Sequence, residues 1–181
     1  MAKRQSYPDW LKEEFGGLIE TLALSDAQKR FLRSRWLDQV AWMEGKASET
    51  QRRYYQLRLT TVIGAVIVPA LVSLEALGGG LGEVTKVASV VISLIVAVSA
   101  AIEQFFDFGG RWQHYRQTVE RLKTEGWSFF QLSGRYHVEG ATHSATYPAF
   151  AERVEEIIQS DVEVFVTEIA GEKERQQAGK R

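Results

Sequence analysis

The residues best suited to act on ions lie at regular intervals in the second of two apolar segments. They recur every three or four residues, so a helix would hold them on one face: Ser89, Ser93, Val96, Ala100, Glu103 and Asp107. If several copies surrounded an axis, Glu103 and Asp107 would form acidic rings at one mouth of a pore. Glu75 would form another ring near the opposite side. Acidic rings concentrate cations and repel anions, so this pattern predicts a cation pathway.

A simpler interpretation is that the small residues only let helices pack closely, while the acids end the apolar segments in water. The opposite face of the second segment suits lipid, because it holds Val91, Ile95, Val98 and Ile102. The first segment has a comparable small face, with Thr61, Ala65, Pro69 and Ser73 at every fourth position. From these residues alone, a pore and simple helix packing remain equally open.

Residues that would support catalysis or hold a metal or cofactor are scarce. The 181 residues include no cysteine, and the three histidines lack the spacing of a metal site. The glycine cluster at 78–82 lacks the lysine and hydroxyl residue that end a phosphate-binding loop. A net charge of −1 argues against a nucleic-acid partner. We therefore expect no enzyme, no cofactor and no nucleic-acid binding.

Two stretches without charged residues predict membrane spans. Residues 59–74 and 87–102 carry no charge. Each reaches the length of a span, roughly 20 residues, once its boundary residues are included. We expect spans at about 57–77 and 86–106, in a hairpin occupying 57–108. The alternative is a hairpin buried inside a soluble bundle. Soluble helices normally carry a polar face, however, and the polar positions here are only Ser, Thr and Gly, which suit helix packing in lipid.

Basic residues flank both predicted spans on the same side. Arg52, Arg53 and Arg58 precede the first, and a second group follows the second: Arg111, Arg116, Arg121 and Lys123. Because positive charge marks cytoplasmic flanks, both termini should be cytoplasmic in a multi-pass protein of the inner (plasma) membrane. The glycine-rich link would lie on the far side.

The flanking regions are predicted to be helical, which makes the fold all-α. We expect N-terminal cytoplasmic helices over 1–56 and C-terminal ones over 109–181, with both spans continuing into them. Ser25 and Gln28 form a capping-box pattern that opens a helix. The apolar side of that helix is Phe31, Leu32, Trp36, Val40 and Met43. A short helix at 9–22 should pack on this bundle or lie on the membrane, and Pro148 should open the last helix.

Trp112, Tyr115, Arg116 and Glu120 follow the second span at helical spacing, with Arg116 and Glu120 four residues apart. They are suited to a ligand or lipid-headgroup site, because Trp and Tyr favour that depth and Arg contacts phosphates. They are equally suited to a buried network in which Arg116 contacts a neighbouring carboxylate. We favour the structural interpretation.

Residues 112–125 resemble the W-x-x-Y-R-x-T-x-E-x-L-K-x-E signature of domain-of-unknown-function family 4231. Gly64-Ala65 with Pro69, and the segment 150–155, are also similar to that family. The resemblance covers roughly residues 30–170. It implies membership of the SLATT class, small bacterial two-span proteins with a cytoplasmic helical bundle that are proposed to form pores.

The sequence and this resemblance together favour an oligomeric membrane protein that conducts cations and has a cytoplasmic bundle for assembly and gating. Its expected partners are the lipid membrane, further copies of itself and cations. Two alternatives fit the same hairpin. One is a non-conducting, membrane-anchored interaction or sensing module, and the other is a membrane-disrupting effector.

Overall fold

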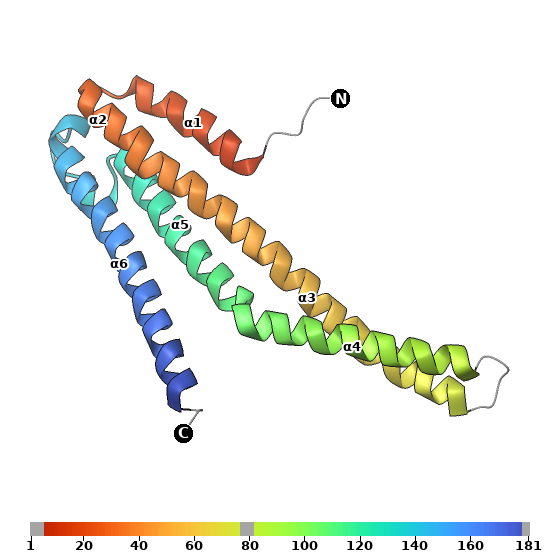
Figure 1. The fold of residues 1–181 in the computed structure, drawn as a ribbon. Helices are drawn as coiled ribbons and strands as arrows, with labels where there is room; N and C mark the ends of the chain where they lie inside the picture. Colours follow the sequence, from red (N-terminus) through yellow and green to blue (C-terminus); the bar gives the residue numbers. More distant parts are fainter. Residues whose placement is uncertain (1–5, 77–81, 179–181) are drawn as a thin grey trace, which may run out of the picture. The chain divides into compact units, whose positions relative to one another are not determined.

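The computed structural model describes residues 6–76 and 82–178, with side chains at 6–74 and 82–163. The described residues form helices and no strands, which confirms the all-α prediction. The elements appear in Figure 1 in this order: α1 (Tyr7–Thr21), α2 (Asp26–Phe31), the π-helix η1 (Leu32–Leu37), α3 (Asp38–Ala76), α4 (Gly82–Phe106), α5 (Phe108–Phe130), the 3-10 turn η2 (Gly134–Tyr136) and α6 (His143–Ala178).

The chain divides into two compact units. The first unit comprises residues 1–45 and 115–181, and the second comprises residues 46–114. Helices α3 and α5 each contribute residues to both units. The apolar segments lie in the second unit.

The first unit is built around a fully buried tryptophan. Trp36 on η1 donates a hydrogen bond from Nε1 to the Leu122 carbonyl on α5, 3.0 Å away. Gly126, one turn further along α5, gives the indole its space, because a Cβ there would lie 2.1 Å from Trp36 Cζ2. Phe15 on α1 and Phe150 on α6 pack edge-on to the same ring. One side chain thus joins four elements.

Helix-start signals explain the boundaries of this unit, with one exception. The capping box at Ser25 and Gln28 is present, and four of the five predicted apolar residues, Leu32, Trp36, Val40 and Met43, are fully buried. The short N-terminal helix packs on the bundle through Leu11, Phe15 and Ile19. The prediction for Pro148 was wrong: α6 begins at His143, and Pro148 lies inside it. Thr142 opens the helix instead, since its hydroxyl accepts a hydrogen bond from the Ala145 amide.

In the second unit, α3 and α4 lie side by side (Figure 1). They approach closely at Gly64, where an added Cβ would lie 2.1 Å from Val96 Cγ2 and 3.7 Å from Ile92 Cγ2. Gly64 is accordingly buried, although its neighbours on α3 are exposed. A residue without a side chain is what allows the two backbones to come together here.

Candidate functional site

The apolar windows of α3 and α4 are almost entirely uncovered by the rest of the chain. Both helices are long and apolar enough to cross a membrane, but only 6% and 11% of the residues in their windows are buried. Val66 on α3 is 71% exposed and Leu94 on α4 is 65% exposed. A core helix of a soluble protein would be mostly buried. The chain therefore does not shield these segments by its own folding.

The face of α4 predicted for lipid is exposed. Its members range from 39% to 50% exposure: Val91, Ile95, Val98 and Ile102. They are flanked by further exposed apolar side chains, including Val87 and Val90. The contact with α3 lies on another side of the helix, at Ile92 and Val96.

The predicted small stripe does not share one environment. Ser89 is buried, and its hydroxyl donates to carbonyls of its own helix, at Thr85 and Lys86. Glu103 and Val96 are half-buried, whereas Ser93 and Ala100 are exposed. Hydroxyl groups that bond back to their own helix can sit beside apolar surroundings at little cost. The stripe therefore combines residues near the α3 contact with residues that α3 leaves uncovered.

The prediction that Asp107 continues this stripe was wrong, because α4 ends at Phe106. Asp107 has a φ of 43°, in the left-handed region, and its Oδ1 accepts a hydrogen bond from the Gly110 amide at 3.1 Å. It thus caps α5. Gly110 is required by this geometry, since a Cβ there would lie 2.3 Å from Asp107 Oδ2. The second span therefore does not continue as one unbroken helix.

The remaining predicted positions have other outcomes. Glu75 belongs to the backbone of α3, and its side chain lies outside those that the structure describes. On the first segment, Thr61 is half-buried, but Ala65, Pro69 and Ser73 are exposed. The small face of α3 is therefore not its contact with α4, which is made through Gly64 instead.

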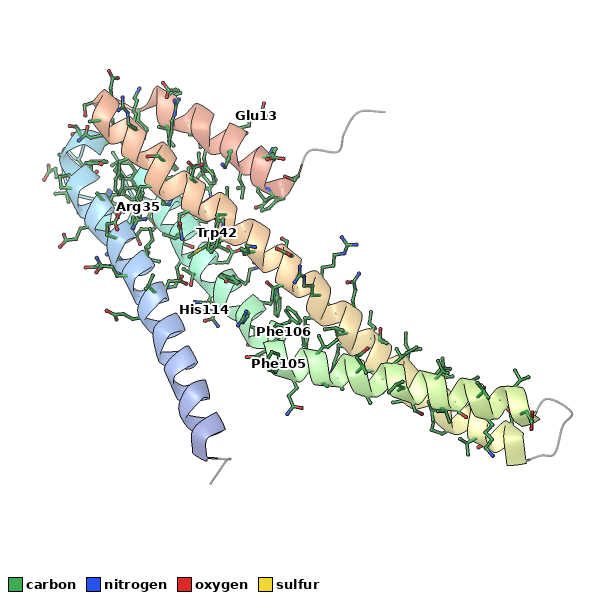
Figure 2. All side chains as sticks on the ribbon, viewed as in Figure 1. Glu13, Arg35, Trp42, Phe105, Phe106 and His114 are labelled. Carbon is green, nitrogen blue, oxygen red and sulfur yellow. The ribbon has the colours of Figure 1, made fainter. Side chains whose placement is uncertain are left out.

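Aromatic and arginine side chains meet in the second unit at the level where α4 gives way to α5. The guanidinium of Arg53 lies 5.9 Å from the Phe108 ring centroid, within cation–π range. Trp112 lies with its ring 6.4 Å from that of Tyr55. Phe105 is 75% exposed (Figure 2). Such rings beside arginine are typical of a membrane–water boundary.

Arg116 and Glu120 belong to a compact ion network in the first unit. At its centre is Glu44, only 2% exposed, with its carboxylate 2.8 Å from Arg116 Nη1 and 3.3 Å from Lys123 Nζ. Glu120 contacts the same two cations, at 3.3 Å and 2.7 Å. The guanidinium of Arg116 is thus engaged by protein carboxylates, as the structural interpretation requires. Tyr115 packs edge-on to Trp42, 6.0 Å between ring centroids.

The ion network shifts the pKa values of two of its members. Burial raises the pKa of Glu120, but its hydrogen bonds and charge interactions with Lys123 and Arg116 outweigh burial and leave that pKa below its ordinary value. Burial lowers the pKa of Lys123, and the two glutamates more than reverse that effect. Both shifts favour the charged form of the side chain.

Sequence reasoning missed Glu44, which sits directly after Met43 in the buried stripe of α3. A charged residue at a position that the apolar period assigns to the core is the signal that points to it. Across the described part of the chain, no group of three or more His, Cys, Asp or Glu side chains is placed to hold a metal ion.

Comparison with known proteins gives one match. The family model described as "Protein of unknown function (DUF4231)" matches residues 38–144, which include all of α3, α4 and α5. No curated protein and no solved structure matches the chain.

Proposed function

We propose that the chain, which belongs to the DUF4231 family of unknown function, is an oligomeric integral membrane protein that conducts cations. The observation that carries the membrane assignment is the low burial of the two apolar windows, 6% and 11%. Contiguous apolar surface of this extent is unfavourable in water and is favourable in lipid.

The proposed arrangement is a two-span hairpin with both termini in the cytoplasm. Arg52, Arg53 and Arg58 on α3 lie at the end of the apolar window that is also marked by Phe105 and Phe108. Between residues 59 and 110, Lys86 is the single basic residue in the sequence. Positive charge collected at one end supports placing that end at the cytoplasmic surface.

Assembly of several copies is proposed because one pair of helices cannot enclose a water path. Ser93 and Ala100 lie on the same face of α4 as Val96, on either side of its contact with α3, and both remain exposed. Small residues on an uncovered face let a helix of another copy approach closely. In such an assembly, Glu103 is the acid we assign to the cytoplasmic mouth, since Asp107 serves as the cap of α5.

A single preparation can test the proposal. The purified full chain would be reconstituted in nanodiscs and its mass determined by mass photometry. Protein from the same purification would be reconstituted in vesicles and assayed for cation flux. We expect an oligomer with cation-selective flux, reduced severalfold by Glu103→Gln. The matched control is Glu83→Gln, which removes an exposed acid at the start of α4. A monomer, or flux equal in both variants, would contradict conduction through a ring of Glu103.

A second candidate is a non-conducting, membrane-anchored interaction module. The first unit favours it, because it has an aromatic core of its own around Trp36 and a hollow between α1 and α5. An oligomer without flux in the same assay would support this function over conduction.

A further inference from the structure

A hollow of 190 Å³ opens between α1 and α5 in the first unit. Its walls are largely aromatic: Tyr7 and Trp10 come from α1, and Trp127 comes from α5. These three side chains are 49%, 45% and 44% exposed, which is high for large aromatic residues in a packed unit. Phe15 also lines the hollow and is only 2% exposed, with its ring 5.1 Å from that of Trp127.

The aromatic walls are held in place by contacts outside the hollow itself. Tyr7 and Trp10 stack on each other, with centroids 5.6 Å apart and planes 19° from parallel. Phe15 is fixed by Trp36, 5.2 Å away in the buried core. The hollow is therefore a preformed feature of the unit and needs no rearrangement to accept a ligand.

Among the described residues, the charges around the hollow sum to a negative value. Glu14, Glu120 and Lys123 line it, and Glu44 and Arg116 complete the ion network behind it. Three carboxylates against two cations leave a net charge of −1. Glu14 has no ion-pair partner within the described part of the chain, so its carboxylate is available to a ligand. This excess favours a cation over an anion.

One ammonium group already uses these rings. Lys123 Nζ lies 5.8 Å from the centroid of Tyr7, within cation–π range. Glu44 and Glu120 hold that nitrogen at 3.3 Å and 2.7 Å, so it is not free to fill the hollow. Trp10 and Trp127 offer the same kind of aromatic surface and have no cation of their own among the described residues.

We propose that this hollow binds an organic cation with a methylated ammonium group. Aromatic walls attract such a group through their ring faces, and it needs no hydrogen-bond acceptors. A hard inorganic cation prefers a shell of oxygen ligands, and no group of three or more acidic, histidine or cysteine side chains among the described residues is placed to hold a metal ion. The group could belong to a free metabolite or to a choline-type lipid headgroup, because both present the same chemistry. The proposal stands whether or not the chain conducts ions.

The direct test is a titration of the full chain in a maltoside detergent with tetramethylammonium chloride, followed by tryptophan fluorescence and compared with sodium chloride at equal ionic strength. We expect a saturable change with tetramethylammonium alone. Glu14→Gln should weaken binding about fivefold, the effect of removing one facing charge. Trp10→Leu should weaken it about tenfold by removing a cation–π partner.

Glu13→Gln is the matched control. Glu13 is the adjacent acid on α1, does not line the hollow, and projects on the side away from the rest of the first unit (Figure 2). Its variant should bind like the unaltered chain. An equal response to sodium, or equal affinities in the Glu13 and Glu14 variants, would overturn the proposal.

Nanodiscs distinguish the two sources of the ammonium group. With a phosphatidylcholine bilayer, a headgroup that occupies the hollow should compete and raise the apparent Kd for tetramethylammonium, relative to phosphatidylglycerol nanodiscs. If the natural ligand is a free cation that headgroups cannot reach, the Kd should be the same in both bilayers. Either result supports the binding chemistry and assigns its source.

Discussion

Arg35 binds Glu155 through two parallel hydrogen bonds, Nε to Oε1 and Nη2 to Oε2, each 2.6 Å long. The two residues are 120 positions apart in sequence, and their contact joins η1 to α6. The paired geometry matches the guanidinium fork to both carboxylate oxygens, an arrangement stronger than a single contact. Sequence-distant ends of the first unit are thereby held in register beside the Trp36 core.

This ion pair predicts a pH-dependent stability. Hydrogen bonding to Arg35 lowers the pKa of Glu155 below its ordinary value, despite some burial. A depressed carboxyl pKa stabilises the fold above the unfolded value, and that contribution is lost as pH falls through the folded value. Because both side chains are more than a third exposed, Glu155→Gln should cost about 1 kcal/mol at pH 7.

Urea unfolding of the first unit, followed by near-ultraviolet circular dichroism at pH 7 and pH 3, would check this. The gap between the original chain and Glu155→Gln should narrow as pH falls, because protonation removes the Glu155 charge that the variant lacks at every pH. Glu152→Gln, an exposed acid on the same helix, should show little effect at either pH. A gap that persists in acid would show that the pair acts through something other than charge.

Glu44 should be the most sensitive member of the ion network. It is 2% exposed between Arg116 and Lys123, so Glu44→Gln would remove the buried carboxylate of the network and leave both cations with Glu120 alone. Breaking a buried pair in this way should destabilise the unit by about 3 kcal/mol. The exposed Glu49→Gln, which loses contacts only on its own helix, should cost less than about 1 kcal/mol. Equal melting temperatures for the two variants would contradict this assignment.

The space around Trp36 predicts opposite effects at two glycines. Gly126→Ala would place a Cβ 2.1 Å from the indole, and overpacking of this kind should cost about 1–3 kcal/mol. Gly45 on α3 has no atom within 4 Å of an added Cβ. Gly45→Ala should therefore be neutral or stabilise the helix by up to about 1 kcal/mol. Thermal melts of both variants would measure the two changes in stability. Destabilisation by Gly45→Ala would contradict the prediction.

Much of the first unit could be predicted because its signals are local. The apolar period placed Leu32, Trp36, Val40 and Met43 in the core, and the capping box placed the start of α2. Glu44 could not be assigned a role in the same way, since its partners are 72 and 79 residues away. A charged residue in a buried stripe can be recognised from sequence. The identity of the cations that compensate it cannot, because it depends on how α5 packs.

The second unit was predicted less well for a different reason. Nearly every face of α4 is apolar or small, so periodicity could not tell which face meets α3; the close contact at Gly64 decides it. Periodicity also extends a helix past its true end. The sequence Asp107-Phe108-Gly109-Gly110 contains the capping residue and the glycines that end α4. A prediction made from helical spacing alone ignores these residues.

The contact between α3 and α4 predicts a compensating pair of substitutions. Gly64→Ala would place a Cβ 2.1 Å from Val96 Cγ2 and force the two helices apart. Thermal stability in nanodiscs should fall by about 1–3 kcal/mol. Adding Val96→Ala removes the clashing methyl groups and should restore most of the loss. If the double variant is no more stable than the single one, the two residues do not meet in the membrane.

Asp107 predicts three different outcomes at one position, because it combines a left-handed backbone with a side-chain cap. Asp107→Asn keeps both abilities and removes only the charge, so the junction between α4 and α5 should be preserved. Asp107→Gly tolerates the φ of 43° but loses the bond to the Gly110 amide, and Asp107→Ala loses both. We expect stability to fall in the order Asn, Gly, Ala, with the alanine variant about 1–2 kcal/mol below the original chain.

Hydrogen exchange at the Gly110 amide measures the junction directly. The amide should stay protected in the asparagine variant and exchange faster in the other two. Fast exchange in the asparagine variant would mean that the carboxylate charge, and not the cap geometry, holds the helices at this break.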